Sequence, residues 1–322
     1  MSFAPWQRLP PGALIAVVAP AGPAAARRVA RVPALIEAQG WRARVYPGCV
    51  ARSGFLAGPD ALRLADLQAA ITDPAVAAVW CLRGGYGSGR LLPALAAARL
   101  VEVLRARPKP LIGYSDITAL HALLDGAGLL ALHAPMPASD LLLPGREADA
   151  AALFGLLRDG LAAGTCWALP PLVPPGLAAS PATDAGDEGP PLRVPGIARG
   201  RLQGGNLSLM AALCGTPWQL ITTGRLLFIE EIGEPPYRID RLLGQLGQAG
   251  LLAAAAGFLL GSFTEAEPPW AVLREHLCAL GKPVLGGWPA GHGTPNRPLP
   301  LGALATLDAG AGTLTIEQDV LV

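Results

Sequence analysis

The stretch Pro108-Lys109-Pro110-Leu111-Ile112-Gly113-Tyr114-Ser115-Asp116-Ile117-Thr118 joins an apolar strand to a helical pattern. A serine at a sharp strand-to-helix turn projects out of the sheet, with backbone N–H groups and the positive end of a helix behind it. Such a position suits a nucleophile, because the same N–H groups can hold the oxyanion that its attack creates. The last position of the common G-x-S-x-G motif is Ile117 here. The local sequence therefore leaves two interpretations open: Ser115 is a nucleophile, or it caps the helix with Asp116 in the first turn.

Strand and helix patterns alternate four times around this stretch. Apolar strand patterns cover residues 13–19, 41–46, 76–82 and 111–113, and helical patterns cover residues 24–40, 60–72 and 91–104 and begin again near 117. This alternation predicts an N-terminal α/β domain with a doubly wound, mainly parallel sheet. Ligands of such sheets bind at the carboxyl ends of the strands, so the loop after residue 82 and Ser115 should face one crevice.

The rest of the chain predicts a second domain. A helical pattern near residues 146–161 precedes a segment, 169–196, that is rich in Pro, Gly, Ala and acidic residues and has no periodicity, which is typical of a linker or mobile surface loop. Strand and helix patterns then resume and end in a hairpin near residues 303–317. We predict an N-terminal domain over 1–140, a helix and linker over 141–198, and a C-terminal mixed α/β domain over 199–322.

Composition excludes several classes of protein. The hydrophobic fraction is 52%, the charged fraction is 15% and the net charge is +1, which argues against disorder and against a nucleic-acid partner. The five cysteines contain no C-x-x-C pair, which favours free thiols in a reducing compartment and argues against structural zinc. Prolines interrupt the apolar run at 13–19, and residues 242–264 divide into a helix and a strand. We therefore expect a cytoplasmic protein with neither signal peptide nor membrane span.

Four histidines are candidates for acid–base chemistry. His121 and His276 fall within helical patterns, so we expect them to be structural or exposed. His133 precedes a proline in an expected loop and is a candidate to line the crevice. His292 lies between two glycines, where a tight turn would leave its ring accessible. It is either a catalytic base or a loop histidine with satisfied hydrogen bonds.

Acidic residues are sparse, which makes the adjacent pair Glu230 and Glu231 informative. Both end an apolar strand, and alternation along a strand directs one side chain inward and the other outward. An inward carboxylate could orient a histidine, whereas the outward one would form a surface salt bridge.

The segment Arg83-Gly84-Gly85-Tyr86-Gly87-Ser88-Gly89 is rich in glycine but matches no nucleotide-binding motif. It lacks the Lys-Ser/Thr of a phosphate loop, and it follows the third strand instead of the first. We expect the glycines here to let backbone N–H groups approach a reacting oxygen. The neighbouring Cys81 lies within a strand, which argues against a thiol nucleophile.

Taken together, these pieces resemble the LD-carboxypeptidase family, which comprises the muramoyltetrapeptide carboxypeptidases and the related microcin immunity peptidases. The ordered matches run nearly end to end: Val18-Ala19-Pro20-Ala21-Gly22, Arg83-Gly84-Gly85-Tyr86-Gly87, Gly113-Tyr114-Ser115-Asp116, His133-Ala134-Pro135-Met136, Gly204-Gly205-Asn206-Leu207-Ser208, Glu230-Glu231, Gly291-His292 and Leu299-Pro300-Leu301-Gly302. No single match is decisive, but their order along the chain is specific.

The resemblance implies a Ser-His-Glu triad of Ser115, Glu230 and His292, with the serine in the first domain and the other two residues in the second. Preferring Glu230 to Glu231 depends on motif alignment. In the expected mechanism the backbone N–H groups of Gly85 and Asp116 form the oxyanion hole. The resemblance also implies a cytoplasmic homodimer without metal or cofactor, which releases terminal D-alanine from a murein tetrapeptide by hydrolysing an L–D amide.

Two departures from the family pattern bear on the substrate. Ala134 replaces the usual glycine of H-G-P-M, and the linker at 169–196 looks longer than is usual. Two alternatives follow. Either the same triad serves an enzyme that detoxifies a peptidyl- or aminoacyl-nucleotide antibiotic, as in microcin immunity, or the chain is a peptide-binding protein without catalytic activity.

Overall fold

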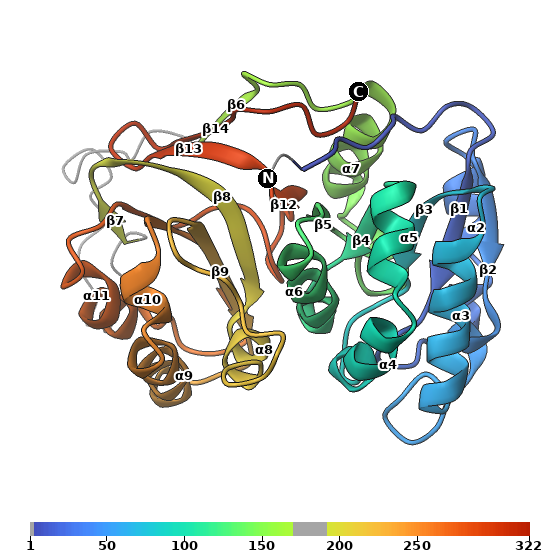
Figure 1. Ribbon diagram of the computed structural model, residues 1–322, viewed down its shortest axis with the longest axis horizontal. Coiled ribbons are helices and arrows are strands. Elements are labelled where there is room, and N and C mark those ends of the chain that lie inside the picture. Colours follow the sequence, from blue (N-terminus) through green and yellow to red (C-terminus); the bar gives the residue numbers. More distant parts are fainter. Residues whose placement is uncertain (1–2, 170–191) are drawn as a thin grey trace.

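The computed structural model describes residues 3–169 and 192–322. Most of the predicted linker, residues 170–191, lies outside this range. Two β-sheets, each with its own helices, form two lobes that stand side by side (Figure 1). The first lobe is mostly blue to green and the second mostly yellow to red, but the red strand β12 belongs to the first sheet and the green strand β6 to the second. The α/β class predicted from the sequence is confirmed for both lobes.

The first lobe is built on a six-stranded sheet. Its strands are β1 (Leu14–Val18), β2 (Arg42–Val45), β3 (Val76–Cys81), β4 (Leu111–Gly113), β5 (Ala131–His133) and β12 (Leu299–Leu301), in the order β12-β5-β4-β3-β1-β2. β1 to β5 are parallel, and β12 returns from the end of the chain to pair antiparallel with β5. Every residue of β1 is buried, because its uninterrupted apolar run suits a strand covered on both faces. The order reverses between β1 and β3, which is the topological switch point of such a sheet.

The helices of this lobe differ from the sequence prediction at two breaks. α3 (Asp60–Thr72) has the predicted bounds, but the helix expected over 24–40 divides into α1 (Ala26–Val29) and α2 (Val32–Glu37), where Pro33 lies in the first turn of the second piece. The helix expected over 91–104 divides into α4 (Leu92–Ala97) and α5 (Leu100–Ala106), because Arg99 takes a left-handed conformation with φ of 54°. The remaining helices are α6 (Thr118–Gly126) and α7 (Glu147–Asp159).

The second lobe contains an eight-stranded mixed sheet. Its strands are β6 (Cys166–Ala168), β7 (Arg193–Val194), β8 (Ile197–Asn206), β9 (Leu226–Ile232), β10 (Gly257–Thr264), β11 (Val284–Leu285), β13 (Leu304–Asp308) and β14 (Thr313–Ile316), in the order β6-β14-β13-β8-β9-β10-β11-β7. Its helices are α8 (Leu207–Ala212), α9 (Pro236–Gln248), α10 (Leu251–Ala254) and α11 (Trp270–Cys278). Within residues 3–169 and 192–322, no helix combines the length and apolar character needed to cross a membrane.

Polar contacts join the two lobes. The carboxylate of Asp125 in α6 accepts a hydrogen bond of 2.7 Å from Arg225, next to β9, and both side chains are largely shielded from solvent. The backbone N–H of Asn206, at the end of β8, donates to the hydroxyl of Thr118 at 3.1 Å. A Cβ atom on Gly205 would lie 2.5 Å from that hydroxyl, so glycine permits the lobes to approach this closely. The carboxyl end of β8 and the start of α6 therefore meet across the interface.

Candidate active site

Ser115 follows Tyr114, the first residue after the end of β4 at Gly113. Its φ of 63° lies in the left-handed region, which is uncommon for a residue with a side chain and is often found at functional turns. A 3-10 turn over Ser115–Ile117 leads into α6. The residues at the two N-cap positions are Tyr114 and Ile117, and neither helix start receives a side-chain cap hydrogen bond. The helix-cap interpretation of Ser115 is therefore wrong, since its hydroxyl points to another partner.

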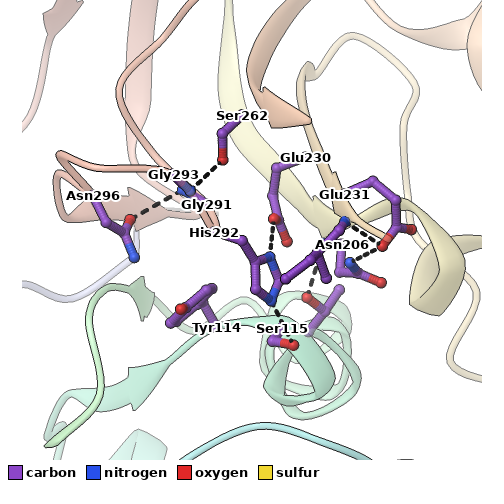
Figure 2. Close-up of polar contacts among 12 residues, drawn as sticks. Tyr114, Ser115, Asn206, Glu230, Glu231, Ser262, Gly291, His292, Gly293 and Asn296 are labelled. Atoms are coloured by element: carbon purple, nitrogen blue, oxygen red, sulfur yellow. Dashed lines mark hydrogen bonds and ion pairs between the residues drawn. The ribbon is translucent and has the colours of Figure 1, made fainter. Parts of the chain in front are cut away.

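That partner is His292, whose imidazole bridges the two lobes (Figure 2). The ring Nε2 lies 3.1 Å from Oγ of Ser115, and the ring Nδ1 lies 2.6 Å from Oε2 of Glu230. Glu230 belongs to β9 and has no exposed surface, whereas 12% of the His292 side chain is exposed. Three residues far apart in the chain thus form one continuous hydrogen-bonded series of carboxylate, imidazole and hydroxyl.

The turn that carries His292 is held by contacts that the sequence did not reveal. The N–H of Gly291 donates to Oδ1 of Asn296 at 3.0 Å, and the N–H of Gly293 donates to Oγ of Ser262 at 2.8 Å. A Cβ atom on Gly291, where φ is 108°, would lie 2.8 Å from the Glu230 carboxylate. Glycine is therefore required before the histidine. The only sequence signal for this turn was the Gly-His-Gly pattern.

Electrostatics favour the protonated form of His292. Burial lowers the pKa of the imidazole, but the charge of Glu230 and its hydrogen bond outweigh this effect and raise the pKa above its usual value. More distant carboxylates, Glu231 and Asp140, act in the same direction. The site is thus suited to accept a proton on the ring while the hydroxyl of Ser115 loses one.

Glu231 has a different environment from its neighbour. Its carboxylate accepts hydrogen bonds from the Asn206 side-chain amide and the Ser208 N–H, both at 2.7 Å, and from the N–H of Ile232 at 2.9 Å. Only 3% of Glu231 is exposed, so the expected outward-facing salt bridge is wrong. The cause is that β9 lies in the middle of the sheet and is buried on both faces.

Tyr114 supports the imidazole from one side. Its ring centroid lies 4.8 Å from that of His292, and its phenol donates to Oδ1 of Asp140 at 2.7 Å. His133 packs on Tyr114 at 5.4 Å and on Phe228 at 4.9 Å between ring centroids. His133 ends β5 and is fully buried, so the expectation that it lines the crevice is wrong. Burial holds its pKa well below the usual value, and its neutral ring acts as packing.

The glycine-rich loop after β3 lies against the serine. A Cβ atom on Gly84 would be 2.8 Å from Cβ and 2.9 Å from Oγ of Ser115, so only glycine fits there. In the described part of the chain, the N–H groups of Gly85 and Asp116 have no acceptor. The Asp116 carboxylate accepts a hydrogen bond from the N–H of Ser88 at 2.8 Å, which ties the loop to the turn. Two backbone donors without an acceptor among the described residues therefore belong to this loop and to the turn that carries the hydroxyl.

Other candidates lie apart from this arrangement. His121 is buried within α6, and His276 in α11 lies 2.6 Å from Asp240, as expected for structural or surface histidines. Cys81 is fully buried in β3, and burial raises the pKa of its thiol. Among the described residues, no group of three or more His, Cys, Asp or Glu side chains could hold a metal ion.

Comparison with known proteins covers almost the whole chain. Residues 15–134 match the family model of the LD-carboxypeptidase N-terminal domain, and residues 199–307 match that of the C-terminal domain. A probable murein peptide carboxypeptidase of Bacillus subtilis is 35% identical over 96% of this chain and 93% of its own length. A murein tetrapeptide carboxypeptidase of Pseudomonas aeruginosa is 35% identical over 94% of this chain and 95% of its own.

Solved structures share the same fold. A muramoyltetrapeptide carboxypeptidase from Oxalobacter formigenes has a TM-score of 0.78 at 29% identity and covers 96% of this chain and 100% of its own. A structure of MccF in complex with glutamyl sulfamoyl guanosine has a TM-score of 0.85 at 22% identity and covers 98% of this chain and 99% of its own. At that identity, the second similarity concerns the fold alone.

Proposed function

The chain belongs to the LD-carboxypeptidase family, and from that membership we propose that it is a serine-type carboxypeptidase that releases terminal D-alanine from murein tetrapeptides. We assign Ser115 as nucleophile, His292 as general base and acid, and Glu230 as the group that orients the imidazole. The observation that carries this assignment is the imidazole itself, which lies within hydrogen-bond distance of both the hydroxyl and the carboxylate.

Acylation follows from these positions. His292 removes the proton from Ser115 as Oγ attacks the carbonyl carbon of the L–D amide. The unpaired N–H groups of Gly85 and Asp116 would hold the developing oxyanion, and each such donor is typically worth about 3 kcal/mol of transition-state stabilisation. The C–N bond then breaks, and the imidazolium gives its proton to the leaving nitrogen. D-alanine is therefore released with a neutral amino group.

Deacylation repeats the same steps with water. His292 takes a proton from the water that attacks the acyl ester, and the ester C–O bond breaks as Ser115 regains its proton. Glu230 fixes the tautomer of the imidazole and stabilises its charged form in both halves of the reaction. No group outside the chain is needed to balance the reaction apart from water.

Defined substrates test the proposal. The purified protein is incubated with a murein tetrapeptide and, separately, with an aspartyl sulfamoyl adenylate, and the products are identified by mass spectrometry. We expect release of D-alanine from the tetrapeptide and none from the Ser115→Ala variant. Cleavage of the nucleotide conjugate alone would instead favour the antibiotic-detoxifying alternative. Binding of the tetrapeptide without turnover would favour the peptide-binding alternative.

We also propose that the protein is a homodimer in the cytoplasm, with no nucleic-acid or membrane partner. The resemblance to the family supports the dimer, and the free thiols among the described residues suit a reducing compartment. Light scattering in solution tests the dimer, which predicts twice the 33.0 kDa mass of the chain. A mass of one chain at micromolar concentration would contradict it.

A further inference from the structure

Arg83 lies in the glycine-rich loop directly after β3, and its side chain is half-buried. Its Nη1 donates to the carbonyl oxygen of Pro23 at 3.1 Å, and its Nε donates to the carbonyl oxygen of Gly84 at 3.2 Å. The guanidinium thus joins the loop after β1 to the loop after β3. A guanidinium has five N–H donors, so these two bonds leave several free.

No carboxylate neutralises this cation within residues 3–169 and 192–322. Partial burial of a charge costs free energy unless an opposite charge accompanies it. Several other arginines of the protein have such partners: Arg63 and Arg90 pair with Asp60, Arg146 with Asp149, and Arg238 with Glu234. An unpaired, half-buried guanidinium therefore has the properties of a site for an anion that arrives from outside.

The position of Arg83 indicates which anion this is. The loops that it joins flank the switch point between β1 and β3, where open α/β sheets bind their ligands. Its Nη2 is 3.9 Å from the place that a Cβ atom on Gly85 would occupy. Gly84, the next residue along the chain, touches Ser115. The cation consequently lies beside the groups that would surround a scissile carbonyl.

We propose that Arg83 binds the C-terminal carboxylate of the substrate and so restricts cleavage to the last residue. This inference rests on the proposed function. One residue of an extended chain spans about 3.6 Å, so the free carboxylate of a terminal residue must lie close to the carbonyl under attack. A cation in the loop that carries the proposed oxyanion donor meets that requirement. The planar fork of a guanidinium also matches a carboxylate through two parallel hydrogen bonds.

The charge distribution of the site favours such a cation. Three acidic side chains besides Glu230 are almost fully buried near the triad: Asp116, Asp140 and Glu231. A substrate with a free carboxylate would meet an unfavourable potential there unless a positive group offset it. Arg28 also lies at this edge of the sheet without an ion pair, but it donates to the carbonyl oxygen of Ala138 and is not part of the glycine-rich loop. It provides a matched control.

The test compares two substrates that differ in one group. A tetrapeptide with a free C-terminal D-alanine and the same peptide ending in D-alanine amide are given to the wild type and to Arg83→Gln, Arg83→Lys and Arg28→Gln. The measured quantity is the ratio of kcat/KM for the acid to that for the amide. Any disturbance of the loop lowers both rates, so this ratio isolates the contribution of the carboxylate.

We expect the wild type to prefer the acid and Arg83→Gln to lose about 10- to 150-fold of that ratio, the range for a hydrogen bond to a charged group. Arg83→Lys should keep more of the preference than Arg83→Gln, and Arg28→Gln should keep all of it. Equal losses on acid and amide in Arg83→Gln, or loss of the ratio in Arg28→Gln, would overturn the inference while leaving the proposed function intact. A wild type that cleaves neither peptide would overturn the proposed function itself.

Discussion

Replacing Glu230 by glutamine removes the negative charge behind His292 and keeps the volume of the side chain. The carboxylate has no exposed surface and contacts Nδ1 at 2.6 Å, so solvent screens the interaction very little. For charge centres about 4 Å apart, an effective dielectric constant of about 20 gives about 4 kcal/mol of attraction between carboxylate and imidazolium. Loss of that term from the transition state corresponds to about a 10³-fold fall in kcat.

The tautomer adds to this effect. A glutamine amide can offer its NH₂ group to Nδ1, which would leave the proton on Nε2 and prevent His292 from accepting one from Ser115. Together the two effects predict a loss of about 10³- to 10⁴-fold in kcat. The pKa of His292 should also fall, because burial lowers it and the main opposing charge is gone. Since the base acts when neutral, the acidic limb of the pH–rate profile should move to lower pH.

The assay is steady-state hydrolysis of a murein tetrapeptide between pH 4 and 9, in the variant and in Glu231→Gln as control. The Glu231 carboxylate bonds to amide groups and not to the imidazole. Glu231→Gln should therefore lose at most about tenfold in kcat and should shift the acidic limb of the pH–rate profile less than Glu230→Gln does. Folding is checked by circular dichroism. Equal losses in the two variants, or an unmoved acidic limb in Glu230→Gln, would refute the assignment of Glu230.

Other substitutions make further predictions. Gly84→Ala places a methyl group 2.8 Å from Cβ of Ser115 and should reduce kcat more than about 100-fold, measured as tetrapeptide turnover, in a protein that still folds. The buried ring of His121 has its pKa lowered to about 3, so unfolding takes up a proton between that pH and the usual 6.5. Stability is therefore lost as pH falls through this window, and His121→Leu should remove a slope of about 1.4 kcal/mol per pH unit from urea unfolding. Gly204→Ala sets a Cβ 1.9 Å from a carbonyl oxygen at φ of 127° and should cost more than about 3 kcal/mol, whereas Gly244→Ala, with open space within α9, should stabilise by about 1 kcal/mol in the same assay.

The elements with strong local signals were predictable. α3 has its predicted bounds because its apolar residues recur at helical spacing, and β4 does because prolines and a glycine bound a short apolar run. The break at Arg99 carries no such signal, since neither glycine nor proline marks its left-handed conformation. The break before α2 is marked by Pro33, but the sequence prediction continued the helix through this proline.

The candidate site likewise contains residues that the sequence predicted and residues that it did not. Ser115 and His292 were candidates because glycine-rich turns mark positions where side chains can reach a crevice, whereas the resemblance to the family supplied the triad and the choice of Glu230. The burial of His133 and Glu231 depends on which strands lie beside β5 and β9. The strand that covers His133 is β12, which comes from residues far along the chain, and a neighbour of β9 is β8. Only tertiary packing determines such pairings, so the sequence alone predicted these two side chains wrongly. The domain boundaries at 140 and 198 stay a prediction.

The most direct measurement of the central claim is covalent labelling by a serine-reactive fluorophosphonate, with the modified residue mapped by tandem mass spectrometry. An imidazole 3.1 Å from Oγ and paired with a buried carboxylate should make this one hydroxyl far more reactive than any other in the protein. We predict one adduct per chain, on Ser115, and its loss when His292 is replaced by alanine. An unlabelled protein, or an adduct on a different residue with Ser115 intact, would contradict the account.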